Sequence, residues 1–244
     1  MQQEYPMIPL FEQFVTETYR GKRLKKNGDK IKKRTAYNYA IVLKILKEFQ
    51  EKKGFALRVR LISKGTFRQF RAERNYWKRF YFQFSQFLYT DKHCFDNYVG
   101  GMMKAIRTFL IYLEKEKLLM VGDFYKLLYI KREEVDIITL LPERLRFLIQ
   151  NKEFDESLPL FLKRCKDFFV FGCTVGLRIS DLSNIQVRDI EEVNNTHYLF
   201  VRSLKTETVS RIKLPTYAVE ILERYGLNKK KPDAPIRYGM PAAI

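Results

Sequence analysis

Cysteine and histidine are scarce in this sequence, and their positions exclude two kinds of site. The three cysteines, Cys94, Cys165 and Cys173, lie far apart, and no Cys-x-x-Cys pair occurs. The two histidines are His93 and His197, and no set of four metal ligands forms around either of them in the sequence. We therefore expect reduced core cysteines, no disulfide framework, no zinc site and no cofactor.

Long apolar runs and a leader sequence are also missing. The strongly apolar stretch 168–177 is too short to span a bilayer, and Lys163, Arg164 and Lys166 precede it. The first residues lack the basic start and apolar run of a signal peptide. We expect a soluble, cytoplasmic protein that has no contact with a membrane.

Acidic residues are few in the first half of the chain. Residues 1–133 contain 29 lysines and arginines but only 13 aspartates and glutamates, whereas residues 134–244 contain 17 and 15. The formal net charge of +18 is therefore concentrated in one half. A solvated basic surface is the ordinary explanation, but such a concentration favours a segment that binds a polyanion, above all nucleic acid.

The first 130 residues are predicted to form a small helical bundle. Apolar residues recur at helical spacing in segments that start near Leu10, Thr66 and Val99, and in a fourth that Thr35 is expected to cap. The first segment ends near Gly21, and a basic loop follows it. Aromatic residues form a stripe on the segment that starts near Thr66, which is more typical of core packing than of a base-stacking surface.

The charged segment 131–136 is predicted to be an interdomain linker, and the character of the sequence changes after it. We expect helices at 142–149, 158–174, 179–185 and 216–225, a β-hairpin of strands 196–202 and 209–214, and an irregular, frayed tail at 227–244. Phe161 and Phe169 are expected to be buried by the long apolar helix, which Gly176 ends. The fold class is mainly α with a small β part.

Two cations beside the predicted hairpin have the chemistry of a phosphate site. Arg178 follows the glycine that ends a helix, so a fixed backbone can hold its planar guanidinium against two phosphate oxygens. Asp181 is placed to cap the next helix or to brace the arginine. Lys205 lies at the hairpin tip, where a lysine can enter a DNA groove and protonate a leaving oxygen. The ordinary alternatives are a structural Arg–Asp pair and a solvated lysine.

The order of these motifs resembles one protein family. The segment 176–182 reads Gly-Leu-Arg-Ile-Ser-Asp-Leu, and it is followed by Val-Arg-Asp-Ile at 187–190, Leu-Lys-Thr at 204–206 and Ile-Lys-Leu-Pro at 212–215. This arrangement is similar to the first half of the catalytic domain of tyrosine recombinases, the phage integrase family. The helical half resembles the core-binding domain of integrases from bacterial mobile elements.

The resemblance implies a fold, an activity and residue roles. It implies a SAM-like core-binding domain at 1–130 and a partial α+β catalytic domain at 137–226. It implies strand exchange without a metal, in which a tyrosine forms a 3′-phosphotyrosyl link to double-stranded DNA within a tetramer of protomers. Arg178 would be the first catalytic arginine, Lys205 the general acid, and Asp181 the residue that supports the arginine.

The sequence departs from the family pattern after the hairpin. No His-x-x-Arg motif follows Arg178, and we assign no nucleophile among Tyr217, Tyr225 and Tyr238. We therefore expect an integrase by descent that binds DNA but does not cleave it as this chain. A truncated, fragmentary or split protein would have this pattern.

Seven residues of the first half are candidates for contacts with DNA phosphates, because they lie at helix starts or on polar faces. They are Lys30, Lys32, Lys33, Arg34, Tyr37, Lys104 and Arg107. Two other functions fit the same sequence. One is a non-enzymatic regulator that competes with an intact integrase for its sites, and the other is an RNA-binding helical protein, in which Arg178 has no role.

Overall fold

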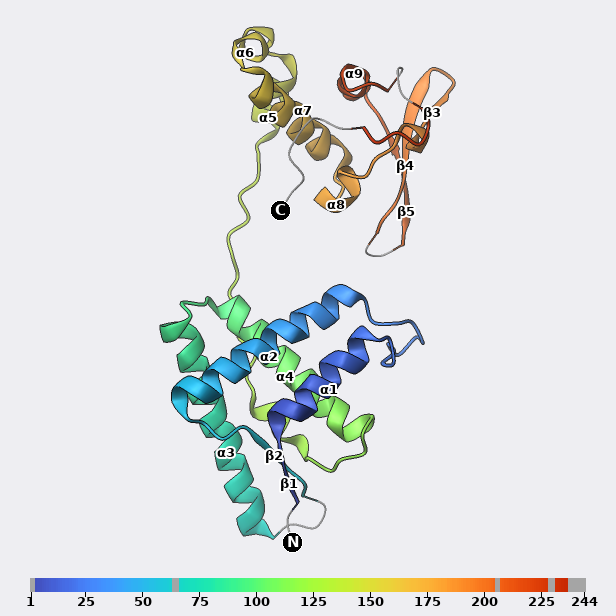
Figure 1. Cartoon of the computed structure of the whole chain (residues 1–244). Coiled ribbons are helices and arrows are strands. Elements are labelled where there is room, and N and C mark those ends of the chain that lie inside the picture. The colour runs from blue at the N-terminus through green and yellow to red at the C-terminus, as the bar shows by residue number, and fades with distance from the viewer. Residues whose placement is uncertain (1–2, 63–65, 205–206, 228–230, 237–244) are drawn as a thin grey trace. The chain divides into compact units, whose positions relative to one another are not determined.

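The computed structural model describes residues 3–62, 66–204, 207–227 and 231–236. It divides into two compact units, Met1–Asp136 and Ile137–Ile244, each with its own hydrophobic core (Figure 1). The chain is mainly helical and has two small antiparallel sheets, which confirms the expected mainly α fold with a small β part. In the described part of the chain, no helix is both long enough and apolar enough to cross a membrane.

Long helices make up most of the first unit. Its elements are β1 (Glu4–Pro6), α1 (Met7–Tyr19), α2 (Lys33–Lys53), β2 (Arg58–Arg60), α3 (Phe67–Gln86), the π-helix η1 (Phe87–Asp91), α4 (Asp96–Lys115) and the 3₁₀-helix η2 (Asp123–Leu127). The start of α3 at Thr66 is as predicted, and the Thr66 backbone N–H donates to the Gln69 side chain at 2.7 Å. The predicted cap Thr35 is wrong, because its N–H already bonds the carbonyl of the actual N-cap, Lys32.

An aromatic cluster forms the centre of this unit's core. The rings of Phe80 and Phe84 on α3 are stacked with centroids 5.4 Å apart. Phe49 of α2 and Phe87 of η1 pack beside them, and all four side chains are fully buried. The aromatic stripe of α3 is therefore core, and its large apolar area holds α2 and α3 together.

One cation of the basic loop between α1 and α2 belongs to the core. The Arg23 side chain is 7% exposed, and its guanidinium donates to both carboxylate oxygens of Glu116 at 2.9–3.1 Å and to Thr18 at 3.0 Å. It also lies 4.3 Å from the ring centroid of Phe14. This pairing compensates the buried charge and ties the loop to the end of α4.

The end of the first unit is held against α4. The side-chain amide of Asn97 forms two 3.1 Å hydrogen bonds with the backbone of Glu133. A Cβ on Gly100 would lie 2.2 Å from the carbonyl oxygen of Lys131, whereas a Cβ on Gly101 would meet nothing within 4 Å. Part of the predicted linker 131–136 is therefore attached to α4, and the exposed residues 134–141 have no helix or strand.

The second unit is built around one long helix and a three-stranded sheet. Its elements are α5 (Pro142–Gln150), α6 (Lys152–Ser157), α7 (Leu160–Val175), α8 (Ile179–Leu182), the 3₁₀-helix η3 (Val187–Asp189), β3 (Ile190–Val193), β4 (Thr196–Arg202), β5 (Val209–Lys213) and α9 (Thr216–Arg224). The predicted hairpin is present as β4 and β5, with Phe200 opposite Arg211. The third strand, β3, was not predicted, because Glu191 and Glu192 interrupt its apolar alternation.

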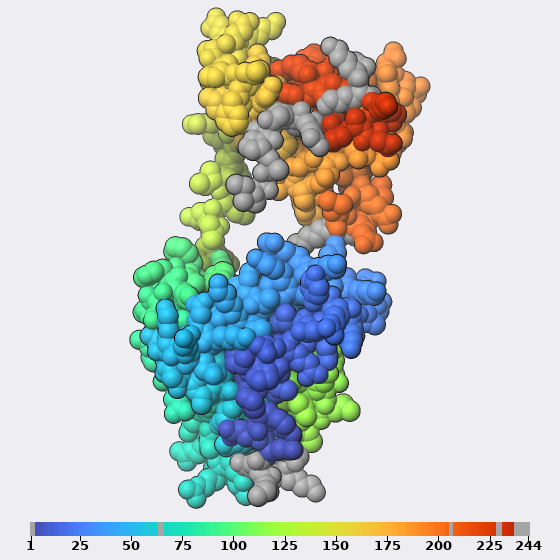
Figure 2. Space-filling model, in the orientation of Figure 1, coloured from blue at the N-terminus to red at the C-terminus, as the bar shows by residue number. Residues whose placement is uncertain are grey.

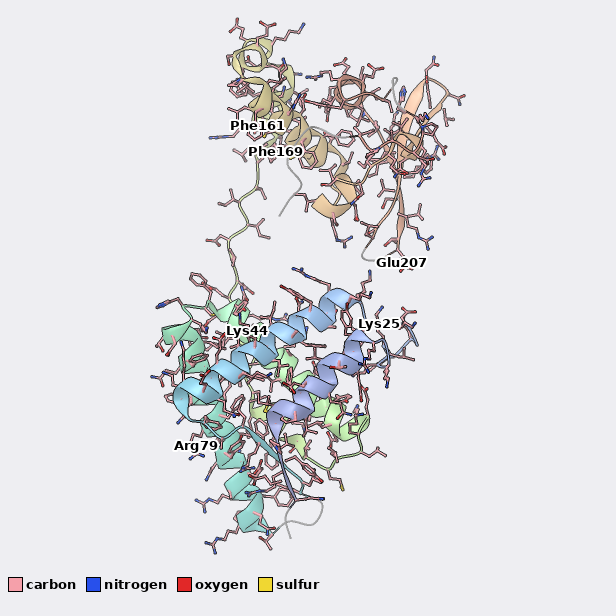
Figure 3. The ribbon with its side chains drawn as sticks, viewed as in Figure 1. Lys25, Lys44, Arg79, Phe161, Phe169 and Glu207 are labelled. Atoms are coloured by element: carbon pink, nitrogen blue, oxygen red, sulfur yellow. The ribbon has the colours of Figure 1, made fainter. Side chains whose placement is uncertain are left out.

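The burial predicted for α7 is wrong at three positions. Phe161 and Phe169 are 56% and 47% exposed, and Cys173 is also exposed (Figure 3). The buried face of α7 instead includes Asp167, whose carboxylate accepts a 3.1 Å hydrogen bond from Arg224. A buried ion pair with a distant partner leaves no signal in the apolar spacing of the helix.

The prediction of a frayed tail is wrong for residues 231–236. Ile236 is 2% exposed and its N–H donates to the carbonyl of Ile185 at 3.0 Å. The N–H of Val187 donates to the carbonyl of Ala234, and Pro235 forms a β-bridge with Gln186. This short segment therefore belongs to the second core, although it has no helix or strand of its own.

The close approach of the chain to α4 gives a direct test. Gly100→Ala is expected to lower the free energy of unfolding of the first unit by about 1–3 kcal/mol, because the new Cβ would overlap the Lys131 oxygen. Gly101→Ala is the matched control and is expected to stabilise the same helix by up to about 1 kcal/mol. Urea unfolding measures both variants, and equal free energies would contradict this packing.

Candidate functional site

Arg178 lies at a sharp change of backbone direction between α7 and α8. Gly176 ends α7 with a φ of 61°, a left-handed conformation that glycine adopts without strain. Arg178 is the N-cap of α8, and its carbonyl accepts 2.9 Å hydrogen bonds from the N–H groups of Asp181 and Leu182. The backbone of Arg178 is thus fixed, while its side chain is 52% exposed.

The turn between β4 and β5 meets this arginine. Arg178 Nη1 donates to Ser203 Oγ at 3.0 Å, and Asp181 Oδ1 accepts from the backbone N–H of Leu204 at 3.1 Å. Within the turn, the N–H of Ser203 donates to the carbonyl of Thr208 at 2.9 Å. Figure 3 labels Glu207 in this turn. The helix start that carries Arg178 and the hairpin turn are therefore joined by two hydrogen bonds.

Asp181 is buried and ionised at this junction. The hydrogen bond from the Leu204 N–H lowers the pKa of Asp181 below its usual value of 3.8, and Ser203 and the charge of Arg178 act in the same direction against the effect of burial. The Oδ2 atom of Asp181 is 4.0 Å from Arg178 Nη1. Asp181 accepts its hydrogen bond from the turn and not from Arg178. Most of the five guanidinium N–H donors of Arg178 therefore have no partner among the described residues.

The predicted site residues of the second unit have different outcomes. Arg178 and Asp181 lie together, as their sequence spacing indicates, but Asp181 braces the hairpin more closely than it braces the arginine. Lys205 lies outside the described residues, as does Tyr238. Ser203 was not predicted to contact Arg178, because a serine before a hairpin tip has no signal of its own in the sequence.

Tyr217 and Tyr225, to which no nucleophilic role was assigned, take part in packing. The hydroxyl of Tyr225 donates to Asp167 at 2.9 Å, and burial together with this carboxylate raises the pKa of Tyr225. The hydroxyl of Tyr217 lies 3.1 Å from Thr174 Oγ1. A tyrosine that attacks phosphorus needs an accessible oxygen that loses its proton readily.

Among the described residues, no group of three or more His, Cys, Asp or Glu is placed to hold a metal ion.

A groove lies on the first unit between α2 and α4, with a volume of about 480 Å³ and a lining of both polar and apolar side chains. Thr35 and Asn38 line it from α2, and Asn97, Gly101 and Lys104 line it from α4. These α4 positions follow helical spacing on the side opposite the apolar stripe that faces the core. The polar stripe, rather than the apolar one, is the signal from which Asn38 and Asn97 could have been predicted.

Four of the predicted phosphate contacts lie at this groove or beside it. Lys33, Arg34 and Tyr37 occupy the exposed start of α2, and Lys104 lines the groove. The guanidinium of Arg34 is 5.3 Å from the ring centroid of Tyr37. Among the described residues, no acidic side chain lies within 4.0 Å of the cationic groups of Lys33, Arg34 or Lys104. Helix α1 and the start of α2 form much of the blue face in Figure 2.

The three remaining candidates are placed differently. Lys30 forms a β-bridge with Leu24 in the loop before α2. Lys32 is the N-cap of α2. The guanidinium of Arg107 lies 5.8 Å from the ring centroid of Tyr125 on η2, and Arg107 does not line the groove. The structure therefore gathers some of the predicted contacts on one face and separates Arg107 from them.

No protein-family model, curated protein or solved structure matches this chain. A functional assignment therefore rests on the chemistry of the two sites and on the sequence motifs that they contain.

Asp181 gives the hairpin turn a predictable response to pH. A carboxyl group with a lowered pKa stabilises the fold while it is ionised, and this contribution is lost as the pH falls below 3.8 toward the folded-state pKa. In the wild type, protection of the Leu204 amide against hydrogen exchange is expected to fall in this range. Asp181→Asn keeps an acceptor oxygen but does not titrate, so protection in this variant is expected to be lower and independent of pH. The same pH dependence in both proteins would rule out this role.

Proposed function

We propose that this protein binds duplex DNA at the recombination sites of a mobile element, as a protein of the tyrosine recombinase kind. The observation that carries the proposal is the junction of Arg178 with the β4–β5 turn. At this junction Arg178, the first catalytic arginine by resemblance, lies next to the β4–β5 turn. The same resemblance assigns the general acid, Lys205, to this turn. In the sequence, Lys205 directly follows Leu204, whose N–H binds Asp181.

The chemistry of Arg178 supports a phosphate ligand. Its guanidinium is permanently charged, planar and half exposed; the N-cap position fixes its backbone, and Ser203 accepts a hydrogen bond from Nη1. Two parallel N–H donors can bind two non-bridging oxygens of one phosphodiester. In this proposal the cations of Arg178 and Lys205 bind the negative charge of that phosphate.

The start of α2 supports a second, sequence-independent contact with DNA. Lys33 and Arg34 lie in the first turn of α2, which contains no acidic residue. The positive end of the helix dipole disfavours cations at this position, so the fold places them there against the local electrostatics. A row of DNA phosphates would compensate both the dipole and the side chains. Lys104 lies across the groove on α4 and adds to the same field.

We propose binding without cleavage for this chain. The hydroxyls of Tyr217 and Tyr225 are bonded within the packing around α7 and α9, and burial raises the pKa of Tyr225. This observation also favours a second candidate function, a regulator that occupies recombination sites and competes with an intact recombinase. Inhibition of a complete recombinase in a mixing assay would support that role.

The salt dependence of DNA binding tests the α2–α4 face. Binding of a random-sequence duplex is expected to weaken with salt, and the triple variant Lys33→Ala, Arg34→Ala, Lys104→Ala is expected to reduce the slope of log affinity against log salt by about 2.7, or about 0.9 per lost phosphate contact. Lys25→Ala is the control, because Lys25, which is labelled in Figure 3, already pairs with Asp29 at 3.3 Å. A triple variant with the wild-type slope would contradict a phosphate-binding role for this face.

Arg178 separates the DNA-binding proposal from the RNA-binding alternative. Arg178→Ala is expected to weaken duplex DNA binding about tenfold, and Arg178→Lys is expected to restore part of it, because charge returns without the planar fork. Arg188→Ala is the control, since this exposed arginine pairs with Asp233. Fluorescence anisotropy with a DNA duplex and a single-stranded RNA of equal length measures all three. Unchanged duplex affinity in Arg178→Ala, with tighter RNA binding, would favour the alternative.

A further inference from the structure

A second hollow on the first unit has no role in the function proposed above. It has a volume of about 500 Å³ and lies between the start of α3 and η2. Phe67, Phe70, Arg71 and Arg74 line it from α3, and Lys126 is among the residues that line it from η2. None of its lining residues takes part in the α2–α4 groove.

Two phenylalanine rings of this hollow are accessible to a ligand. Phe67 is 83% exposed and Phe70 is 43% exposed. The ring of Phe70 lies 6.4 Å from that of Phe124, which is buried below it. Gly122 makes room for Phe124, because its φ is 74° and a Cβ there would lie 2.9 Å from the Phe124 ring. Apolar rings exposed in the same concave surface favour a ligand with a flat face that can cover them.

The charge around these rings is positive. Arg71 and Arg74 are exposed on successive turns of α3, and among the described residues no carboxylate lies within 4.0 Å of either guanidinium. The acidic residue of α3, Glu73, is buried and pairs with Arg58 at 2.7 Å, so it does not neutralise them. Lys126 and Asp123 also line the hollow and pair with each other at 2.8 Å, so they add no net charge to that of the two arginines. The hollow therefore fits an anion.

We propose that this hollow binds single-stranded nucleic acid, with an unpaired base stacked on Phe67 and Phe70 and the adjoining phosphates bound by Arg71 and Arg74. Stacking on exposed aromatic rings requires free base faces, which a duplex does not offer. A phosphate alone would leave the two rings uncovered. An acidic peptide would satisfy the arginines but carries no obligatory flat ring for the aromatic wall.

The aromatic wall is tested with a fluorescent 12-nucleotide oligo(dT) and the full chain. The double variant Phe67→Ala, Phe70→Ala is expected to weaken binding at least about tenfold, in line with the loss of base stacking. Phe82→Ala is the matched control, because Phe82 is 67% exposed on the same helix and does not line the hollow. Circular dichroism and the affinity for a random-sequence duplex are expected to stay at wild-type values, which shows that the variants fold.

The arginines are tested by salt dependence in the same assay. Arg71→Gln with Arg74→Gln is expected to reduce the slope of log affinity against log salt by about 1.4, since each phosphate contact of a single strand contributes about 0.7. Unchanged oligo(dT) affinity in both double variants would overturn the proposal. An equal loss for the matching dT·dA duplex, or full competition by poly-glutamate at equal charge, would overturn it in favour of a duplex or an acidic protein. Because these variants leave the α2–α4 face intact, failure here does not affect the proposed function.

Discussion

One buried carboxylate holds the candidate phosphate site of the second unit together. Asp181 receives the N–H of Leu204 and lies one turn after Arg178 on α8. A second hydrogen bond, from Arg178 to Ser203, also joins the turn to the start of α8. An ionised carboxylate that accepts a backbone N–H forms a strong hydrogen bond because the acceptor is charged. The position of the arginine relative to the hairpin therefore depends on Asp181.

The first unit uses its cations in two distinct ways. Arg23 is a structural cation, paired with Glu116 and covered by the ring of Phe14. Lys33 and Arg34 are exposed at a helix start that disfavours positive charge. Cations of one short segment are thus either buried with an acidic partner, as Arg23 is, or exposed without one, as Lys33 and Arg34 are.

Local patterns in the sequence predicted the elements that depend on local interactions. The Thr66 start of α3, the apolar stripe of α4 and the β4–β5 hairpin each depend on residues close in sequence. Two features that were not predicted involve distant partners: β1 pairs with β2 more than fifty residues away, and Asp167 of α7 accepts a hydrogen bond from Arg224 of α9. The site followed the same division. Arg178 and Asp181 were identified from one motif, whereas Ser203 and the Leu204 N–H reach them through the strand pairing.

The buried pairing of Arg23 has a consequence for how this protein responds to its ionic environment. A guanidinium enclosed by Glu116, Thr18 and an aromatic ring attracts no mobile ions and displaces none from a polyelectrolyte. The same holds in part for each lysine or arginine that already has a carboxylate neighbour. The count of 46 lysines and arginines is consequently an upper bound on the cations that can bind a polyanion. The dependence of polyanion affinity on salt should therefore follow the smaller number of cations that have no carboxylate partner in the fold.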